Sequence, residues 1–166
     1  MLLISVAAST IILHFIWTFF GWVVFPHFLL IFITALVGEH YVSGKGYYHY
    51  TEPNGLFIGR VPTWIPFMWT SVIQGGILLF LSFGLHPTFA VIGSGVVNSL
   101  LDLLVIEPFF CKIRDLWRWT PVERGYFSFV PPDLNRFTAP IGNYVTWLLF
   151  PLITNSVLLY LHAFFG

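Results

Sequence analysis

Three carboxylates stand in apolar parts of the sequence, where acidic residues are unusual. Glu39 closes one hydrophobic segment, Asp102 lies within another, and Glu107 comes near the end of that second segment. An ionisable group in a membrane-spanning segment is costly unless it faces water or a protein interior, so each is a candidate for function. A carboxylic acid that keeps its proton can act as a general acid, and an ionised one as a general base. These three residues are the predicted catalytic groups.

Asp102 and Glu107 are five positions apart, which is an awkward interval on an α-helix. With 3.6 residues per turn, their side chains point about 140° apart and do not form one stripe. Pro108 is expected to end the helix and to turn Glu107 inward, so that the two carboxylates flank a cavity. Asn98 lies four positions before Asp102 on the same helix face. A purely structural hydrogen bond between Asp102 and Asn98 is the alternative interpretation.

The six histidines raise the question of a metal site. Only His40 and His49 lie near the carboxylates in the sequence. No histidine pair has the four-residue spacing of a zinc-protease helix, and no Glu-x-x-His pairing recurs to form a di-iron bundle. We therefore expect no metal and no cofactor. Iron or zinc held by His40, His49 and carboxylates stays open as an alternative.

Aromatic side chains are concentrated in two stretches, residues 38–69 and residues 107–147, which we expect to lie against each other. Trp and Tyr are typical of anchors at a membrane surface, but they can also line a site for a long apolar ligand. The predicted substrate-binding residues are Tyr48, His49, Tyr50, Trp69, Asn98, Trp117, Trp119, Asn143 and Trp147.

The composition shows what must position these groups. Of 166 residues, 57% are hydrophobic and 8% are charged, against about 25% charged in an ordinary soluble domain. So much apolar surface predicts lipid as the solvent. A formal net charge of zero gives no electrostatic footprint for nucleic acid, and a single cysteine excludes an internal disulfide framework.

The pattern predicts one all-α domain, residues 1–166, built as a polytopic transmembrane helix bundle of about five spans. A span needs about 20 apolar residues, and breaks are expected at Pro26-His27 and His86-Pro87. The first segment lacks the charged start and cleavage site of a signal peptide, so it is expected to be a retained span. The expected spans are residues 2–25, 27–42, 62–85, 88–110 and 140–165.

The basic residues predict the orientation in the membrane. All seven Lys and Arg residues lie in the two loops at residues 43–61 and 111–139, and the opposite turns have none. Because basic residues are enriched in cytoplasmic loops, the N-terminus and both loops are expected in the cytoplasm of a multi-pass protein of the cell membrane.

The order of several residues resembles that of the membrane carotenoid hydratases, the gamma-carotene and bisanhydrobacterioruberin hydratase group. The first set is Glu39, Gly44, Gly46, Tyr48, Tyr50 and Gly59-x-Val61-Pro62-x-x-Ile65-Pro66-x-x-Trp69. The second set is Asp102, Glu107-Pro108, Trp117-x-Trp119, Gly125-Tyr126-Phe127 and Pro140-x-x-Asn143-Tyr144-x-x-Trp147. The chain would be a short member of that family.

The resemblance implies a lyase of carotenoid biosynthesis that adds water across a terminal C=C bond of a long isoprenoid or polyene without a cofactor. Asp102 would be the acid, and Glu39 or Glu107 would position the water. His49, Tyr48 and Tyr50 would orient these groups, while the tryptophans would line the carbocation and the polyene.

A non-enzymatic function is the alternative hypothesis. A small polytopic subunit that packs against a larger membrane-protein partner, and that binds lipid or pigment, would show the same phenylalanine content and small-residue helix faces. A transporter is less favoured because the sequence shows no inverted repeat.

Overall fold

The computed structural model describes residues 1–120 and 139–166, and the chain folds into a bundle of long apolar helices. The predicted all-α class is confirmed. The helical elements are α1 (Leu2–Phe20), η1 (Gly21–Val23), α2 (Val24–Gly44), η2 (Glu52–Asn54), α3 (Ile65–Ser82), α4 (Pro87–Leu101), η3 (Asp102–Ile113) and α5 (Ile141–Phe165). Arg124, Arg136 and the Gly125-Tyr126-Phe127 motif lie outside the described residues.

The first turn of the bundle lies at Gly21 and not at Pro26-His27. Gly21 has φ 61°, a left-handed conformation that favours glycine, and it ends α1. Pro26 instead falls in the first turn of α2, where its missing N–H has no helical partner to lose. The expected boundary was therefore wrong by about one helical turn.

The second turn follows the sequence pattern more closely. Gly84, with φ 75°, comes just after α3. His86 caps α4, since its Nδ1 accepts a hydrogen bond from the backbone N–H of Thr88. Pro87 occupies the first turn of α4, a position that proline favours. The break expected at His86-Pro87 is found.

The helix that carries Asp102 and Glu107 does not end at Pro108. It changes from α4 into the π-helix η3, which continues through Pro108 to Ile113. A π-helix bonds each N–H to the carbonyl five residues back, and such segments are frequent at functional sites. The wider turn also accommodates a proline that an α-helix interior would not tolerate. The expectation that Pro108 ends this helix is corrected.

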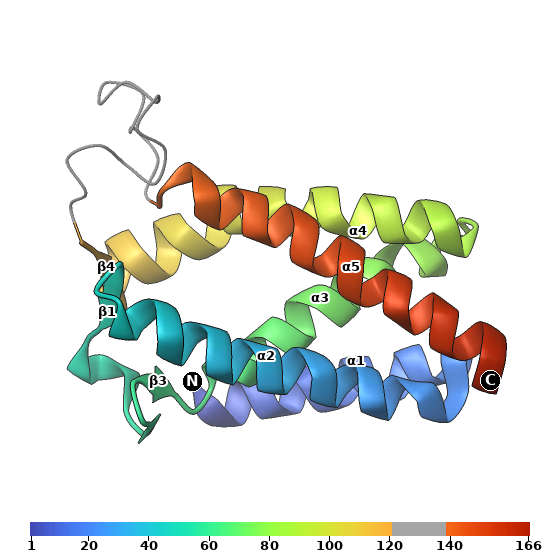
Figure 1. Cartoon of the computed structure of the whole chain (residues 1–166), viewed down its shortest axis with the longest axis horizontal. Helices are drawn as coiled ribbons and strands as arrows, with labels where there is room; N and C mark the ends of the chain where they lie inside the picture. The colour runs from blue at the N-terminus through green and yellow to red at the C-terminus, as the bar shows by residue number, and fades with distance from the viewer. Residues whose placement is uncertain (121–138) are drawn as a thin grey trace.

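In the described part of the chain, four helical segments are long and apolar enough to cross a membrane: Leu2–Gly44, Ile65–Ser82, Pro87–Ile113 and Ile141–Phe165. The first of them contains the turn at Gly21, so α1 and α2 run back along each other (Figure 1). Many large apolar side chains point outward, for example Leu3, which is 85% exposed. An outer surface of this kind suits lipid, and it supports membrane association.

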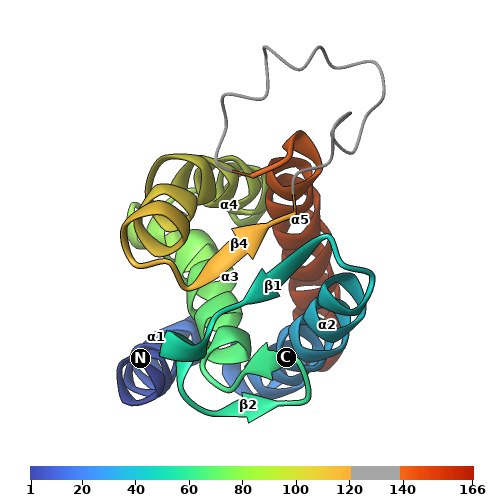
Figure 2. The same cartoon turned by 90° about the vertical axis from the view of Figure 1, so that its left-hand side faces the viewer.

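Two small β-ribbons cover one end of the bundle. The strands are β1 (Tyr48–Tyr50), β2 (Phe57–Ile58), β3 (Val61–Pro62) and β4 (Trp117–Trp119). Within the described residues, β1 pairs antiparallel with β4, and β2 pairs with β3. Seen end-on, β1 and β4 cross the end of the bundle between α2 and α4 (Figure 2). We call this the loop end, and the opposite end, with Gly21 and Gly84, the turn end.

Candidate functional site

The π-helical turn brings Asp102 and Glu107 to the same side of the helix. Both are almost fully buried, at 1% and 2% exposed. The side-chain amide of Asn143, at the start of α5, donates to Asp102 Oδ2 at 2.6 Å and to Glu107 Oε1 at 3.3 Å. One amide nitrogen therefore holds both carboxylates. The residue interval that looked unfavourable on an α-helix is the interval at which π-helical hydrogen bonds repeat.

Glu107 is further held by two tryptophans of strand β4. The indole N–H groups of Trp117 and Trp119 donate to Glu107 Oε2 at 3.2 and 2.9 Å. With Asn143, three N–H donors surround this carboxylate, and donors of this kind favour the ionised form over the neutral one. Among the described residues, Asp102 has a single donor, on Oδ2. Of the pair, Asp102 is therefore the better placed to carry a proton.

Glu39 reaches the same place from α2. Its Oε2 accepts a hydrogen bond from the Tyr50 hydroxyl at 2.9 Å, and its Oε1 accepts one from the Trp69 indole at 3.0 Å. The Trp69 ring also packs on Trp147, with 4.7 Å between ring centroids. Glu39 is half-buried. Residues from α2, β1, α3 and α5 thus meet around one acidic group.

All three carboxylates line a single cavity of about 40 Å³. A buried water needs roughly 10–15 Å³ of such volume, so the cavity has room for about three water molecules. Among the described residues that line it, none is Lys, Arg or His. The lining residues are Glu39, Tyr48, Tyr50, Ile65, Met68, Trp69, Asp102, Ile106, Glu107, Trp117, Trp119, Asn143 and Trp147.

A larger cleft of about 440 Å³ adjoins this cavity. The two share Glu39, Tyr48, Trp69, Trp119 and Asn143, so the cleft opens onto the carboxylates. Its side walls are α2 and α5, the two helices that lie in front in Figure 1. A volume of this size is in the range of about 300–1,000 Å³ that small-molecule sites occupy.

The cleft walls include residues that sequence reasoning missed. On α2 these are Thr34, Gly38 and Val42, and on α5 they are Gly142, Thr146 and Phe150. Each set repeats at four-residue intervals and so forms one helix stripe. Small or hydroxyl-bearing residues on two such stripes were a readable signal for a gap between two helices.

The β1–β4 ribbon positions the aromatic side of the site. Tyr48 pairs with Trp119 and Tyr50 with Trp117, so alternate side chains of both strands face the cavity. Beyond the strands, the Thr51 N–H donates to the Leu116 carbonyl at 3.0 Å. Burial and the charge of Glu39 raise the pKa of Tyr50 well above its usual range, so this phenol remains a hydrogen-bond donor. The expected contact between the two aromatic stretches is present.

His49 and Asn98, two of the expected site residues, do not line the cavity. His49 pairs with Arg118 on the exposed face of β1, so the orienting role expected of it has no geometric support. Asn98 is buried one turn from Asp102 but lies against Gly76 of α3. The other ten expected residues line it.

His40 also has a different place from the one that the metal alternative requires. Its Nδ1 accepts a hydrogen bond at 3.3 Å from the backbone N–H of Arg60, in the turn between β2 and β3. Its ring packs so closely on Gly59 that a Cβ there would lie 2.8 Å away. In the part of the chain that the structure describes, no three His, Cys, Asp or Glu side chains are arranged to hold a metal ion.

Comparison with known proteins returns nothing. No protein family, curated protein or solved structure matches this chain. The chemistry that the chain can perform is therefore inferred from the geometry of the site. That geometry combines three carboxylates, one bridging amide and six Tyr or Trp side chains at the mouth of an apolar cleft. It suits proton transfer to an apolar ligand and the shielding of a positive charge by aromatic faces.

Proposed function

We propose that the protein is a cofactor-independent membrane hydratase that adds water across a terminal C=C bond of a long isoprenoid or polyene. One observation carries the proposal: Asn143 holds Asp102 and Glu107 together in a cavity that Glu39 also lines. A shared amide between two carboxylates, without a lining cation among the described residues, suits a pair that carries one proton. The resemblance to carotenoid hydratases suggests the same chemistry.

Asp102 is the proposed acid. Its Oδ1 makes no hydrogen bond within residues 1–120 and 139–166, while Oδ2 accepts from Asn143. A proton on Oδ1 therefore faces no competing acceptor. Asp102 transfers this proton to the less substituted alkene carbon. The alkene π pair forms the new C–H bond, and a tertiary carbocation remains on the neighbouring carbon.

The aromatic lining stabilises that cation. Trp69, Trp147, Trp119 and Tyr48 line the space next to the carboxylates. The negative faces of such rings attract a cation by about 0.5–2 kcal/mol each. The ionised Glu107 adds a counter-charge at short range. An unpaired cation of this kind would not survive in an apolar site that lacked these groups.

A second carboxylate completes the addition. A water in the cavity attacks the cation, and its oxygen forms the new C–O bond. Glu107 takes the released proton, and Glu39 orients the water from the opposite wall. Transfer of that proton from Glu107 to Asp102 restores the starting state, so that the net change is addition of one H₂O.

The cleft between α2 and α5 is the proposed place for the rest of the substrate. Its volume of about 440 Å³ accommodates only the terminal part of a long chain. The remaining chain would then lie in the bilayer, which is its natural solvent. This arrangement presents the terminal double bond to the carboxylates and leaves the apolar tail outside the site.

The decisive experiment compares Asp102→Asn with wild type. Membranes of a host that makes long polyenes are extracted, and hydrated products are measured by liquid chromatography and mass spectrometry. We expect Asp102→Asn to insert normally and to lose hydration by about 10²–10⁴-fold, the usual contribution of a general acid. Asp115→Asn is the matched control, because Asp115 pairs with Arg118 outside the cavity.

Four other outcomes would revise or replace the proposal. Hydration that persists in Asp102→Asn removes this residue from the chemistry. Polyene that is bound but never hydrated by wild type makes the protein a non-catalytic binder, and a stably co-purifying protein makes it a subunit of a membrane complex. Iron or zinc at stoichiometric amounts in purified protein would favour a metal-dependent enzyme.

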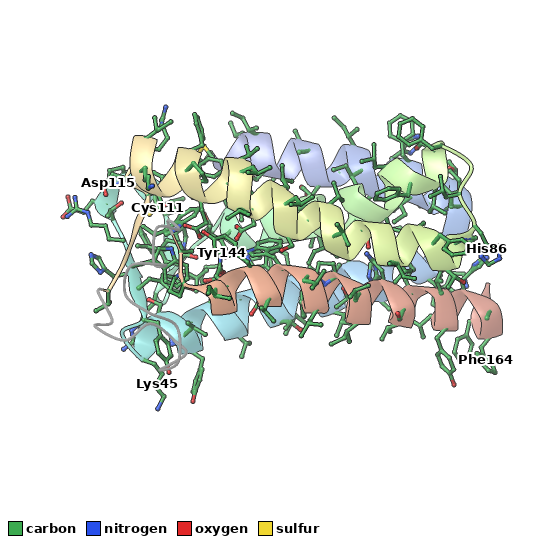
Figure 3. All side chains as sticks on the ribbon, turned by 90° about the horizontal axis from the view of Figure 1, so that it is seen from above. Lys45, His86, Cys111, Asp115, Tyr144 and Phe164 are labelled. Carbon is green, nitrogen blue, oxygen red and sulfur yellow. The ribbon has the colours of Figure 1, made fainter. Side chains whose placement is uncertain are left out.

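We further propose that the protein lies in the cell membrane with its N-terminus and loop end in the cytoplasm. The described basic residues support this orientation: Lys45, Arg60, Lys112, Arg114 and Arg118 belong to the loop end, where Figure 3 labels Lys45 and Asp115 far from His86. Single cysteines placed at Lys45 and His86 should react differently with an impermeant thiol reagent on intact cells. Labelling at position 45 from outside would overturn this orientation.

A further inference from the structure

A second buried polar cluster lies among the helices and is not used by the acid–base chemistry above. Its side chains come from α2, α3, α4 and α5, and none is more than 1% exposed. We call it the polar column: His27, Gln74, Ser94, Asn98 and Asn155. Burying polar side chains at this depth is costly in a membrane protein, so such residues are candidates for a functional role.

Side-chain contacts within the polar column connect the four helices in pairs. Gln74 Nε2 and His27 Nδ1 are 3.3 Å apart and join α3 to α2. The side-chain amide of Asn155, on α5, donates to Ser94 Oγ of α4 at 2.9 Å. It also approaches the carbonyl of Ile73, the residue before Gln74, at 3.5 Å. These contacts link polar side chains of α2 with α3 and of α4 with α5, and the Ile73 carbonyl lies between the two pairs.

The polar column leads to the catalytic acid. Ser94, Asn98 and Asp102 follow each other at four-residue intervals and are all buried, so they lie on one helix face. Gly76 of α3 makes room beside Asn98, because a Cβ at that position would lie 2.5 Å from Asn98 Oδ1. The absence of a side chain at Gly76 therefore lets Asn98 pack directly against the backbone of α3.

Four polar atoms along this path have no hydrogen-bond partner in the described part of the chain. They are Gln74 Oε1, Asn155 Oδ1, Asn98 Nδ2 and Asp102 Oδ1, and His27 Nε2 at the α2 end of the polar column is a fifth. Buried polar atoms in proteins are almost always paired, and internal water supplies the partner when the protein does not. Because these atoms include acceptors as well as a donor, their partner must be able both to donate and to accept a hydrogen bond. Water has that chemistry.

We propose that the polar column binds a chain of internal water molecules that ends at Asp102 and exchanges water and protons with it. The role at Asp102 rests on the proposed hydratase function, whereas the water chain itself does not. Along such a chain each water accepts a proton on one side and releases one on the other, so no net change occurs within it. The chain replaces the water that each hydration consumes and helps return the proton to Asp102.

Radiolytic footprinting tests the water chain directly, because hydroxyl radicals formed from bound water oxidise the side chains beside it. Ile73 and Ile16 form a matched pair: both are 0% exposed and both belong to apolar clusters, but only Ile73 has its carbonyl next to Asn155 of the polar column. In purified wild-type protein we expect Ile73 to be oxidised several-fold faster than Ile16. Equal rates would overturn the proposal.

Two variants complete the test. Asn155→Leu and Gln74→Met replace a polar side chain by an apolar one of similar size, and each should reduce oxidation of Ile73 to the rate of Ile16. Ser156→Ala, at an exposed position next to Asn155, should change nothing. For the link to Asp102, Asn155→Leu should lower kcat at unchanged KM. An unchanged kcat with reduced oxidation would overturn that link alone, and a protein without hydratase activity would leave the oxidation result intact.

Discussion

The two ends of the bundle bury different kinds of side chain, although the same helices run through both. At the turn end, an apolar cluster that includes Ile16, Ile77 and Leu158 packs almost without exposure. At the loop end, three carboxylates are buried among tryptophans and tyrosines. The packing at the turn end therefore favours stability, while the buried carboxylates of the proposed site at the loop end reduce it.

This difference shows how an acidic cluster is kept inside an apolar protein. Each carboxylate of the cavity has a donor from another element of the fold: Asn143 for Asp102, Trp119 for Glu107 and Tyr50 for Glu39. The donors are uncharged. They therefore hold the acids in place without the ion pairs that would neutralise them.

Asn143→Leu should give the largest effect on activity. It removes the amide that holds both carboxylates of the pair, so the acid and the base lose their relative position. We expect hydration to fall by about 10²-fold or more. The unfolding free energy should fall by only about 1–3 kcal/mol, the cost of unpaired buried polar groups. Product analysis and thermal unfolding in detergent measure the two quantities, and normal turnover would contradict the proposed site.

Ile77→Ala should give the opposite result at the turn end. It opens a cavity in the apolar cluster and should reduce the unfolding free energy by about 2 kcal/mol, the lower end for such changes because lipid also solvates apolar groups. Turnover measured well below the unfolding temperature should be close to wild type. A large loss of turnover in the folded variant would mean that the two ends are coupled.

Trp119→Phe separates the ring of a site tryptophan from its N–H group. The variant keeps an aromatic face beside Tyr48 but removes one donor to Glu107. Hydration should fall by roughly tenfold, about 1.4 kcal/mol, as expected for one hydrogen bond to a charged group. Trp17→Phe, on the exposed surface of α1, is the control and should behave as wild type. If Trp119→Phe lost as much activity as Asn143→Leu, the main role of the donors would be to stabilise the charge of Glu107 and not to position it.

Tyr50 should remain protonated at alkaline pH. Burial and Glu39 raise its pKa well above the usual value, whereas the unfolded phenol ionises at about pH 10. The stability that Tyr50 contributes is thus present below about pH 10 and is lost as the pH rises from there toward its folded pKa. The tyrosinate absorbance of wild type minus Tyr50→Phe should be flat through pH 10. A rise near pH 10 would place this phenol in contact with water.

His49→Ala should have the smallest effect. His49 is exposed on β1 opposite Arg118, outside the cavity. We expect wild-type turnover and an unchanged unfolding temperature. A marked loss of turnover would show that this face of the ribbon contacts the substrate after all.

Much of the fold was readable because lipid imposes simple rules. Apolar length predicts helices such as Ile141–Phe165 almost to the residue. The carboxylates were readable as well, since acids such as Glu39 are expensive among apolar residues. The turn at Gly21 was missed because Pro26 looked like the stronger break, although proline in a first helical turn breaks nothing.

The arrangement in which the three acids come together could not be predicted from the sequence. It depends on the π-helix from Asp102 to Ile113 and on contacts between positions far apart, such as Asn143 with Asp102. Local sequence preferences do not encode those contacts. The position of His49 outside the cavity could not be predicted either, because only the pairing of β1 with β4 decides which side chains of the strand face inward.

The β1–β4 ribbon also dictates when the site can form during synthesis. The α1–α2 and α3–α4 hairpins can form from neighbouring parts of the chain, but β1 must wait for β4, and Asp102 must wait for Asn143. Contacts between such distant positions close late, because the entropy of a long loop must be overcome first. The nascent protein therefore passes through a stage in which Asp102 lacks its donor, Asn143. Asp102 and Glu107 can therefore be held together only once Asn143, at the start of α5, has been synthesised.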